Sequence, residues 1–158
     1  MTIQDWFDKY GEHHTNPINK TIHWICVPAI FFSLIGLLSL ISLDLGSELM
    51  PYYLNEQLHM GTLLIIFGLI FFSRLSWPIT VGMAIVSFLI LKGVTNMHRI
   101  DLNVLNVNLW IFGIAWVGQY IGHKIEGAKP SFFDDIKFLM IGPAWLLSFI
   151  YKQLGIKY

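Results

Sequence analysis

Three histidines lie at the edges of long apolar segments, in positions where their side chains can do chemistry. His14 and His23 lie near the start of the first apolar segment, and His123 follows the fourth, far along the chain. Glu126 comes three residues after His123. Imidazole nitrogens bind iron, zinc and copper, and a carboxylate shifts the preference towards harder metals. If these four side chains meet, they predict a metal site, and non-haem iron sites that activate oxygen use such ligands with open positions for substrate and O2.

Two amide side chains stand at helical spacing from the histidines. Asn19 precedes His23 by four residues, and Gln119 precedes His123 by four. Residues four apart share one face of a helix. Gln119, His123 and Glu126 therefore share a face provided that their helix continues past the membrane edge.

Spacing alone leaves a second interpretation of the histidines open. Single histidines at a membrane interface are common and often only hydrogen-bond headgroups or the backbone. Polar residues embedded in a membrane are costly and usually functional, which favours a site when several converge. From spacing alone, the group is either a metal site or a set of interfacial side chains.

The composition predicts one integral-membrane domain over residues 1–158. The chain is 55% hydrophobic and 13% charged, with a mean hydropathy of +0.61. A soluble domain carries about 25% charged residues, so this chain has too few to cover a water-facing surface. Zero net charge and a pI near 7.0 give no indication of a nucleic-acid-binding surface. Cys26 is the single cysteine, which excludes an intramolecular disulfide.

The hydropathy pattern predicts an all-α polytopic bundle with four spans. Residues 2–12 fit an amphipathic helix in the membrane interface, with Thr2 as its cap. Asn16-Pro17 is typical of a helix start. The four uncharged runs long enough to approach a bilayer's thickness are 24–43, 58–73, 75–91 and 102–122. A polar connection is expected over 92–101, and tryptophans near the ends of the runs are interpreted as interface anchors.

The last apolar run, 138–151, is shorter and contains Gly142-Pro143. It is expected to form a short C-terminal apolar helix that crosses partway, lies in the interface or packs as a cap. Gly118 and Gly122 form a small-residue motif that predicts close packing of two helices.

The basic residues predict which ends of the spans face the cytoplasm. With four spans, six basic residues fall on one face and two, Lys92 and Arg99, on the other. The six are Lys9, Lys20, Arg74, Lys124, Lys129 and Lys137, and Lys152 and Lys157 join them if the last run does not cross. Cytoplasmic loops carry the excess of Lys and Arg. His13, His14, His23 and His123 then lie at the cytoplasmic interface, and His59 and His98 at the opposite one.

Two ordered motifs carry a family resemblance over nearly the whole chain. The first runs Tyr10, His14, Asn16-Pro17, Asn19, His23 and Pro28; the second runs Gln119, Gly122-His123, Glu126, Pro130 and Gly142-Pro143. Together they resemble the small membrane proteins related to the fungal endoplasmic-reticulum 2-hydroxy-fatty-acid dioxygenase of phytosphingosine breakdown. Ser131 departs from the pattern, where Ala is expected after the proline.

The resemblance implies an Fe(II)-dependent α-oxidation, in which a 2-hydroxy fatty acid and O2 give a fatty acid one carbon shorter. His14, His23 and His123 are then the expected iron ligands, with Glu126 a fourth ligand or a partner that orients His123. Asn19 and Gln119 are expected to orient ligands or substrate. The resemblance also implies a location in the lipid bilayer, in the endoplasmic reticulum of a eukaryote or the inner membrane of a bacterium.

Other functions remain open at this point. One is a haem-binding or electron-transfer membrane protein with histidines as axial ligands. Another is a non-catalytic lipid-binding or scaffold protein, and a third is a zinc hydrolase.

Overall fold

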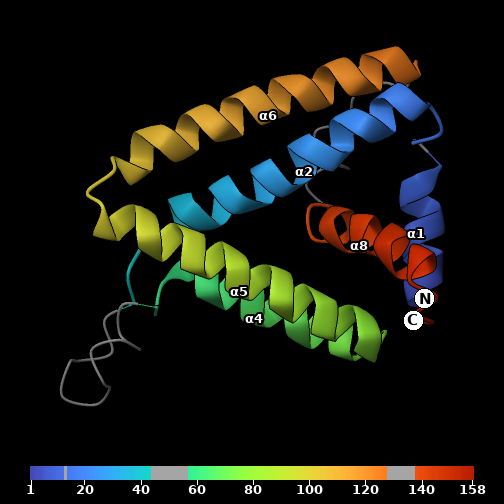
Figure 1. Cartoon of the computed structure of the whole chain (residues 1–158), viewed down its shortest axis with the longest axis horizontal. Helices are drawn as coiled ribbons and strands as arrows, with labels where there is room; N and C mark the ends of the chain where they lie inside the picture. The colour runs from blue at the N-terminus through green and yellow to red at the C-terminus, as the bar shows by residue number, and fades with distance from the viewer. Residues whose placement is uncertain (13, 44–56, 128–137) are drawn as a thin grey trace.

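The structure is a computed structural model that describes residues 1–12, 14–43, 57–127 and 138–158. The described residues form helices with no strand beyond an isolated bridge between Ser42 and His59, which confirms the predicted all-α class. The long helices run roughly alongside one another, and α1 lies across one end of them (Figure 1). Both chain termini lie at that same end. We call this the N-terminal end of the bundle and the opposite one the far end.

Helix α1 spans Ile3–Gly11 and begins at a capping box, as predicted. The Thr2 hydroxyl accepts a hydrogen bond from the Asp5 amide at 3.2 Å, and the Asp5 carboxylate accepts one from the Thr2 amide at 2.6 Å. Ile3, Phe7 and Tyr10 form the buried face of the helix. This amphipathic face fixes α1 across the end of the bundle and brings Tyr10 towards α2.

Helices α2 (Pro17–Leu38) and α6 (Val104–Glu126) form a close antiparallel pair (Figure 1). A Cβ atom on Gly122 would lie 2.3 Å from Asn19 Oδ1, and one on Gly118 would lie 2.6 Å from Cys26 Sγ. Both distances are below van der Waals contact, so only glycine allows the helices to approach this closely. The predicted role of the Gly118/Gly122 motif in helix packing is confirmed.

Helices α4 (Met60–Ser73) and α5 (Trp77–Arg99) form a hairpin whose turn ends at Ser76, the N-cap of α5. The predicted polar connection over 92–101 is wrong, because α5 continues to Arg99. Val94 and Met97 are buried, so the apolar face of the helix continues past the first charged residue, Lys92. Charge on the exposed face marks the edge of the apolar segment without ending the helix.

Helix α8 (Ile141–Gln153) packs against α1, α2 and α5. It begins inside the bundle, where the Met140 side chain lies against Gly68 of α4, and it ends beside the chain termini (Figure 1). Thirteen residues extend about 20 Å, well short of a bilayer's apolar core. The helix ends beside the chain termini, so Lys152 and Lys157 lie at the N-terminal end, and the expected relation of this run to the membrane stays a prediction.

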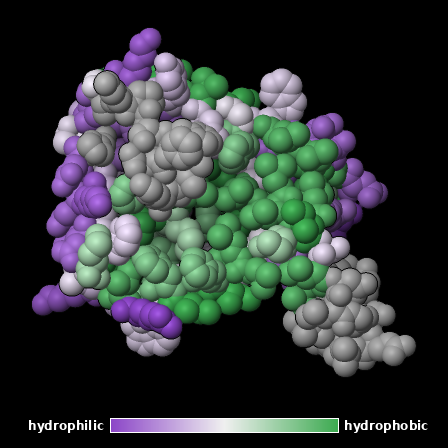
Figure 2. All heavy atoms as spheres, turned by 180° about the vertical axis from the view of Figure 1, so that it is seen from behind, coloured by the Kyte–Doolittle hydropathy of each residue, from purple (hydrophilic) through white to green (hydrophobic). Residues whose placement is uncertain are grey.

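Three described helices are long and apolar enough to cross a membrane: α2, α5 and α6. Helix α4 is equally apolar but has 14 residues, so the predicted number of four spans stays a prediction. Figure 2 shows a continuous hydrophobic surface over the middle of the molecule, with hydrophilic residues gathered at its sides. This distribution suits a bundle surrounded by lipid, with polar groups reserved for the two membrane faces.

Candidate metal centre

Three histidines from different parts of the fold meet at the N-terminal end of the bundle. His14 lies in the link between α1 and α2, His23 in the second turn of α2, and His123 in the last turn of α6. One ring nitrogen of each lies within 4.8 Å of those of the other two. All three side chains are buried, with exposed fractions of 4%, 1% and 5%. The structure thus brings together the three residues that the sequence singled out as metal ligands.

Main-chain carbonyl groups orient two of the three rings. His14 Nδ1 lies 2.6 Å from the Tyr10 carbonyl oxygen, and His23 Nδ1 lies 2.9 Å from that of Asn19. A carbonyl oxygen only accepts, so both Nδ1 atoms donate. In the neutral rings, the lone pair is therefore on Nε2, which is the arrangement usual for histidines that bind a metal.

The Nε2 atoms of His14 and His23 lie 2.8 Å apart. Two lone pairs at this distance repel unless a proton or a cation lies between or beside them. Two nitrogens each bound at about 2.1 Å to one ion, at right angles, would lie about 3 Å apart. The donor set, its burial and its spacing therefore fit a metal ion that prefers imidazole, such as iron or zinc.

Aromatic rings cover one side of the cluster. The Tyr10 ring stacks on His14 with centroids 4.3 Å apart, and the Trp145 indole lies 5.5 Å from the same imidazole. Trp145 is buried, so its indole forms part of the wall around the cluster. Its spacing within the last apolar run gave no signal of this role, because the contact depends on α8 folding back towards α1.

Glu126 lies outside the group of three histidines and fastens the start of α2 to the end of α6. Its carboxylate accepts hydrogen bonds from the Thr15 amide at 2.8 Å, the Asn16 amide at 3.0 Å and Asn19 Nδ2 at 3.0 Å. The Thr15 hydroxyl donates a further, short hydrogen bond to it. Every one of these partners donates, which suits an ionised carboxylate. The contacts favour the role of a residue that positions ligands, and direct coordination by Glu126 stays a prediction.

The two predicted amides have different surroundings. Asn19 is fully buried; its carbonyl group orients His23 and its side chain holds Glu126. Gln119 is 6% exposed and lines a cavity of about 20 Å³ with Tyr10, Trp116 and other apolar residues. Its Oε1 has no hydrogen-bond partner among the described residues. The cavity has room for one water-sized molecule beside the cluster.

The remaining histidines divide as the charge count predicted. His59 caps α4 and His98 lies in the last turn of α5, so both are at the far end. His13 lies outside the described residues. No sequence pattern singles out Thr15, because its contact with Glu126 joins residues far apart in the chain.

The comparisons with known proteins identify the family of this chain. Residues 1–154 match the family model described as 2-hydroxy-palmitic acid dioxygenase Mpo1-like. The chain is 29% identical over 147 residues to the 2-hydroxy-palmitic acid dioxygenase MPO1 of Saccharomyces cerevisiae, which covers 90% of this chain and 76% of the yeast protein. No solved structure matches the chain. Because the family model extends over both motifs and all three clustered histidines, the chain belongs to the Mpo1-like family of 2-hydroxy-palmitic acid dioxygenases.

Proposed function

We propose that this protein is an Fe(II)-dependent membrane dioxygenase that converts 2-hydroxy fatty acids into fatty acids one carbon shorter. Family membership supports the dioxygenase class, and the similarity to the yeast 2-hydroxy-palmitic acid dioxygenase supports a 2-hydroxy fatty acid as substrate. The observation that carries the proposal is the buried convergence of three histidines, two of which have their Nδ1 atoms committed to carbonyl groups. Such a triad suits a metal ion with further positions open to ligands.

His14, His23 and His123 would hold the ferrous ion. The ion would supply a Lewis acid for the two head oxygens of the substrate and a centre that binds and reduces O2. The Tyr10 and Asn19 carbonyl groups keep two of the rings in the orientation that binding requires. Glu126 holds the link that carries His14, through Thr15 and Asn16.

Tyr10 and Trp145 exclude water from the His14 side of the centre. Gln119 lines the adjoining cavity and has a side-chain oxygen without a partner among the described residues, so it is placed to orient a small reactant there. These residues act on access and orientation, while the chemistry of oxygen belongs to the metal.

The proposed overall reaction balances without an external reductant. A 2-hydroxy fatty acid and one O2 give the shortened acid, CO2 and water. The bond between C1 and C2 breaks, C2 is oxidised from an alcohol to a carboxylic acid, C1 leaves as CO2, and O2 accepts four electrons.

The position of the cluster suits an amphiphilic substrate. The carboxylate and 2-hydroxyl group of the substrate would lie at headgroup level, beside the histidines, and its tail among the helices. Lys20 and Lys124 lie near the cluster in the sequence, on its helices, and can attract the carboxylate. On the predicted topology this end faces the cytoplasm.

The geometry also bears on the alternatives. A haem iron with two axial histidines separates their nitrogens by about 4 Å across a porphyrin plane, whereas the His14 and His23 nitrogens lie 2.8 Å apart. This distance disfavours that pair as axial ligands. A zinc hydrolase shares the donor set, and a non-catalytic lipid-binding protein would need none of these histidines.

Product analysis tests the proposal. The purified protein, loaded anaerobically with ferrous iron, is given 2-hydroxypalmitic acid and O2, and the acids are identified by mass spectrometry. We expect pentadecanoic acid in a one-to-one ratio to the O2 consumed, and no product with zinc in place of iron. Hydrolysis of an ester substrate by the zinc form, without O2 consumption, would contradict the proposal.

A further inference from the structure

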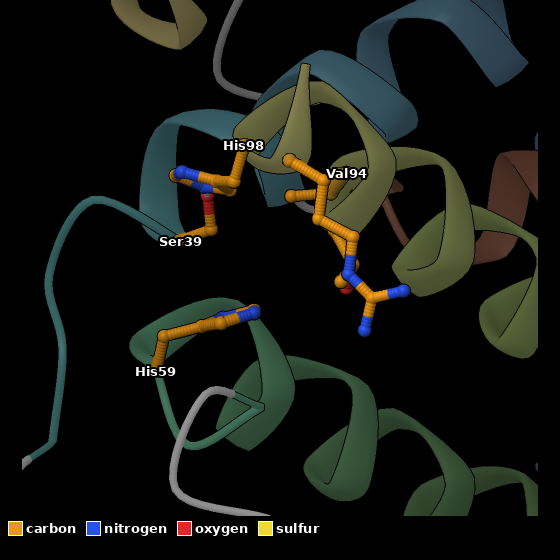
Figure 3. A pocket seen from close by; sticks show the side chains of 6 residues that line it. Ser39, His59, Val94 and His98 are labelled. Atoms are coloured by element: carbon orange, nitrogen blue, oxygen red, sulfur yellow. Dashed lines mark hydrogen bonds between the residues drawn. The ribbon is translucent and has the colours of Figure 1, made fainter. Parts of the chain in front are cut away.

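The far end of the bundle contains two adjoining cavities, distant from the histidine cluster. The first, of about 310 Å³, lies between the end of α2, the start of α4 and the last turns of α5 (Figure 3). The second, of about 620 Å³, extends along α5. Thr95 and Arg99 line both cavities, so the two adjoin at these side chains. We call the pair the far-end groove.

His59 offers a hydrogen-bond donor to this groove. Its Nδ1 accepts a hydrogen bond from the Thr62 amide at 3.2 Å, so Nδ1 carries no proton. Burial, and then the neighbouring His98, lower the pKa of His59, which keeps the ring neutral with its one proton on Nε2. The side chain is 5% exposed and its ring points into the cavity (Figure 3). No described residue accepts a hydrogen bond from Nε2.

The position of His59 is fixed by the backbone around it. The Met60 amide donates to the Ile41 carbonyl at 3.0 Å, and the Leu43 amide donates to the Leu58 carbonyl at 2.8 Å. These bonds tie the chain after α2 to the chain before α4. The donor is therefore held in place without a ligand.

Ser39 and His98 form the opposite wall. The Ser39 hydroxyl donates to the Gly36 carbonyl at 2.6 Å, so it accepts from His98 Nε2, 3.1 Å away. His98 is thereby fixed with a proton on Nε2. Its ring and that of His59 face the cavity from two different helices (Figure 3).

The charge of the far-end groove is positive in the described part of the chain. Arg99 lines both cavities and Lys92 lines the second, and these are the two basic residues that the charge count assigned to this face. No Asp or Glu is among the residues described as lining either cavity. An anion here would meet a guanidinium group, an ammonium group and the His59 N–H.

The second cavity adds an apolar floor. Phe88, Leu91 and Gly93 line it, and Phe88 is 60% exposed on the lipid-facing surface of α5. Lys92 lies over the Phe88 ring at 5.7 Å, at the boundary between the polar and apolar parts. The groove therefore offers a cationic head site next to an apolar strip. These two features are complementary to the head and tail of an anionic amphiphile.

We propose that the far-end groove binds one anionic phospholipid of the opposite leaflet, with its phosphate between Arg99 and His59 and an acyl chain along Phe88 and Leu91. Phosphate suits the combination of a guanidinium fork and a neutral N–H donor. The proposal does not depend on iron or on the oxygenase reaction, because the groove and the histidine cluster are at opposite ends of the bundle.

Native mass spectrometry of the full chain in detergent tests this site. Phosphatidylglycerol and phosphatidylcholine with identical acyl chains are added at equal concentration. We expect one phosphatidylglycerol to be retained per chain of the wild type. The doubly substituted variant Arg99→Gln/His59→Asn should show an occupancy at least five-fold lower. Asn is a good helix cap, so α4 keeps its capping residue in His59→Asn, while the shorter side chain no longer places an N–H group where His59 Nε2 lies.

Arg74→Gln is the matched control, since it removes one exposed positive charge at the N-terminal end of the bundle. It should retain the lipid as the wild type does, and an unchanged melting temperature in phosphatidylcholine shows that each variant is folded. Equal lipid loss in Arg74→Gln and Arg99→Gln/His59→Asn would overturn the proposal. So would displacement of the lipid by an equal concentration of inorganic phosphate, or a preference for palmitate, because a free anion or a carboxylate would then be the ligand.

Discussion

At the scale of single residues, main-chain groups set the chemistry of the histidine cluster. The carbonyl groups that fix His14 and His23 belong to Tyr10 and Asn19, four residues earlier in each case. Such a contact depends on the local backbone conformation and does not require the side chain of the residue whose main-chain carbonyl takes part. Side-chain contacts, by contrast, fasten Glu126 to Asn19 and Thr15. Substitution of a clustered histidine and substitution of Glu126 should therefore affect the metal centre to different degrees.

His14→Ala should abolish catalysis, because it removes one of three proposed metal ligands. Loss of a residue that only orients a ligand costs roughly 10–100-fold in metal affinity or activity, and loss of a ligand should exceed that. His13→Ala is the matched control, since the family motif uses its neighbour. Oxygen consumption with 2-hydroxypalmitic acid measures both variants. A greater loss in His13→Ala than in His14→Ala would show that the wrong histidine has been assigned.

Glu126→Gln should weaken the centre without abolishing it. The neutral amide keeps one acceptor for Thr15 but turns a donor towards groups that are themselves donors, the Asn16 amide and Asn19 Nδ2. We expect iron affinity to fall roughly 10–100-fold. Titration with ferrous iron measures this, with Glu12→Gln as a control of the same charge change at the same end of the bundle. Complete loss of iron in a folded Glu126→Gln protein would instead assign Glu126 as a direct ligand.

At the scale of elements, the approach of α2 to α6 determines whether His23 and His123 meet. Gly122 allows that approach, because its missing side chain leaves space for Asn19. Asn19 in turn bonds to Glu126, so the packing of the two helices and the positioning of the site share residues. The site depends on this pair of helices more than on any loop.

Gly122→Ala should therefore destabilise the protein and lower its iron content. The added Cβ would lie 2.3 Å from Asn19 Oδ1, and such overpacking costs about 1–3 kcal/mol. Gly113→Ala is the control in the same helix, since nothing lies within 4 Å of its added Cβ. Thermal unfolding in detergent compares the two. Equal melting temperatures would mean that the helices do not pack at Gly122.

Local patterns predicted the elements well where a local cause acts. Thr2 with Asp5, and Asn16 with Pro17, each contain the whole of a helix start, and both helices begin there. Charge patterns were less reliable, because Lys92 ends an apolar run while Val94 and Met97 continue the buried face of α5. Trp145 and Thr15 could not be assigned to the site, since their contacts join segments whose approach no spacing specifies.

At the scale of the whole molecule, the two ends of the bundle carry different chemistry. The end with both termini holds the histidine cluster, and the opposite end holds the cavity lined by His59, His98 and Arg99 among the described residues (Figures 1 and 3). The apolar surface between them matches the acyl region of a bilayer (Figure 2). The division of histidines between the two ends was predictable, because each apolar run takes the chain from one end of the bundle to the other, and His59 and His98 are separated by two such runs.

Cysteine labelling should confirm that the histidine end faces the cytoplasm. In a Cys26→Ser background, Lys124→Cys should react with a membrane-impermeant maleimide only after the membrane is opened, while Asp101→Cys should react in intact cells. The reason is the excess of basic residues at the histidine end, where six lie against two at the far end. With Lys152 and Lys157 included, the count is eight against two. The reverse labelling pattern would show the opposite orientation, and labelling of both positions from one side would contradict the bundle itself.

The metal content of the purified protein tests the central claim most directly. Full-length protein is purified anaerobically, and its iron and zinc are measured per chain alongside its oxygen consumption. We predict about one iron per chain in the wild type and in His98→Ala, and loss of iron and activity together in His23→Ala/His123→Ala. An active wild-type protein that holds no metal, or a folded His23→Ala/His123→Ala protein that keeps its iron, would contradict the account.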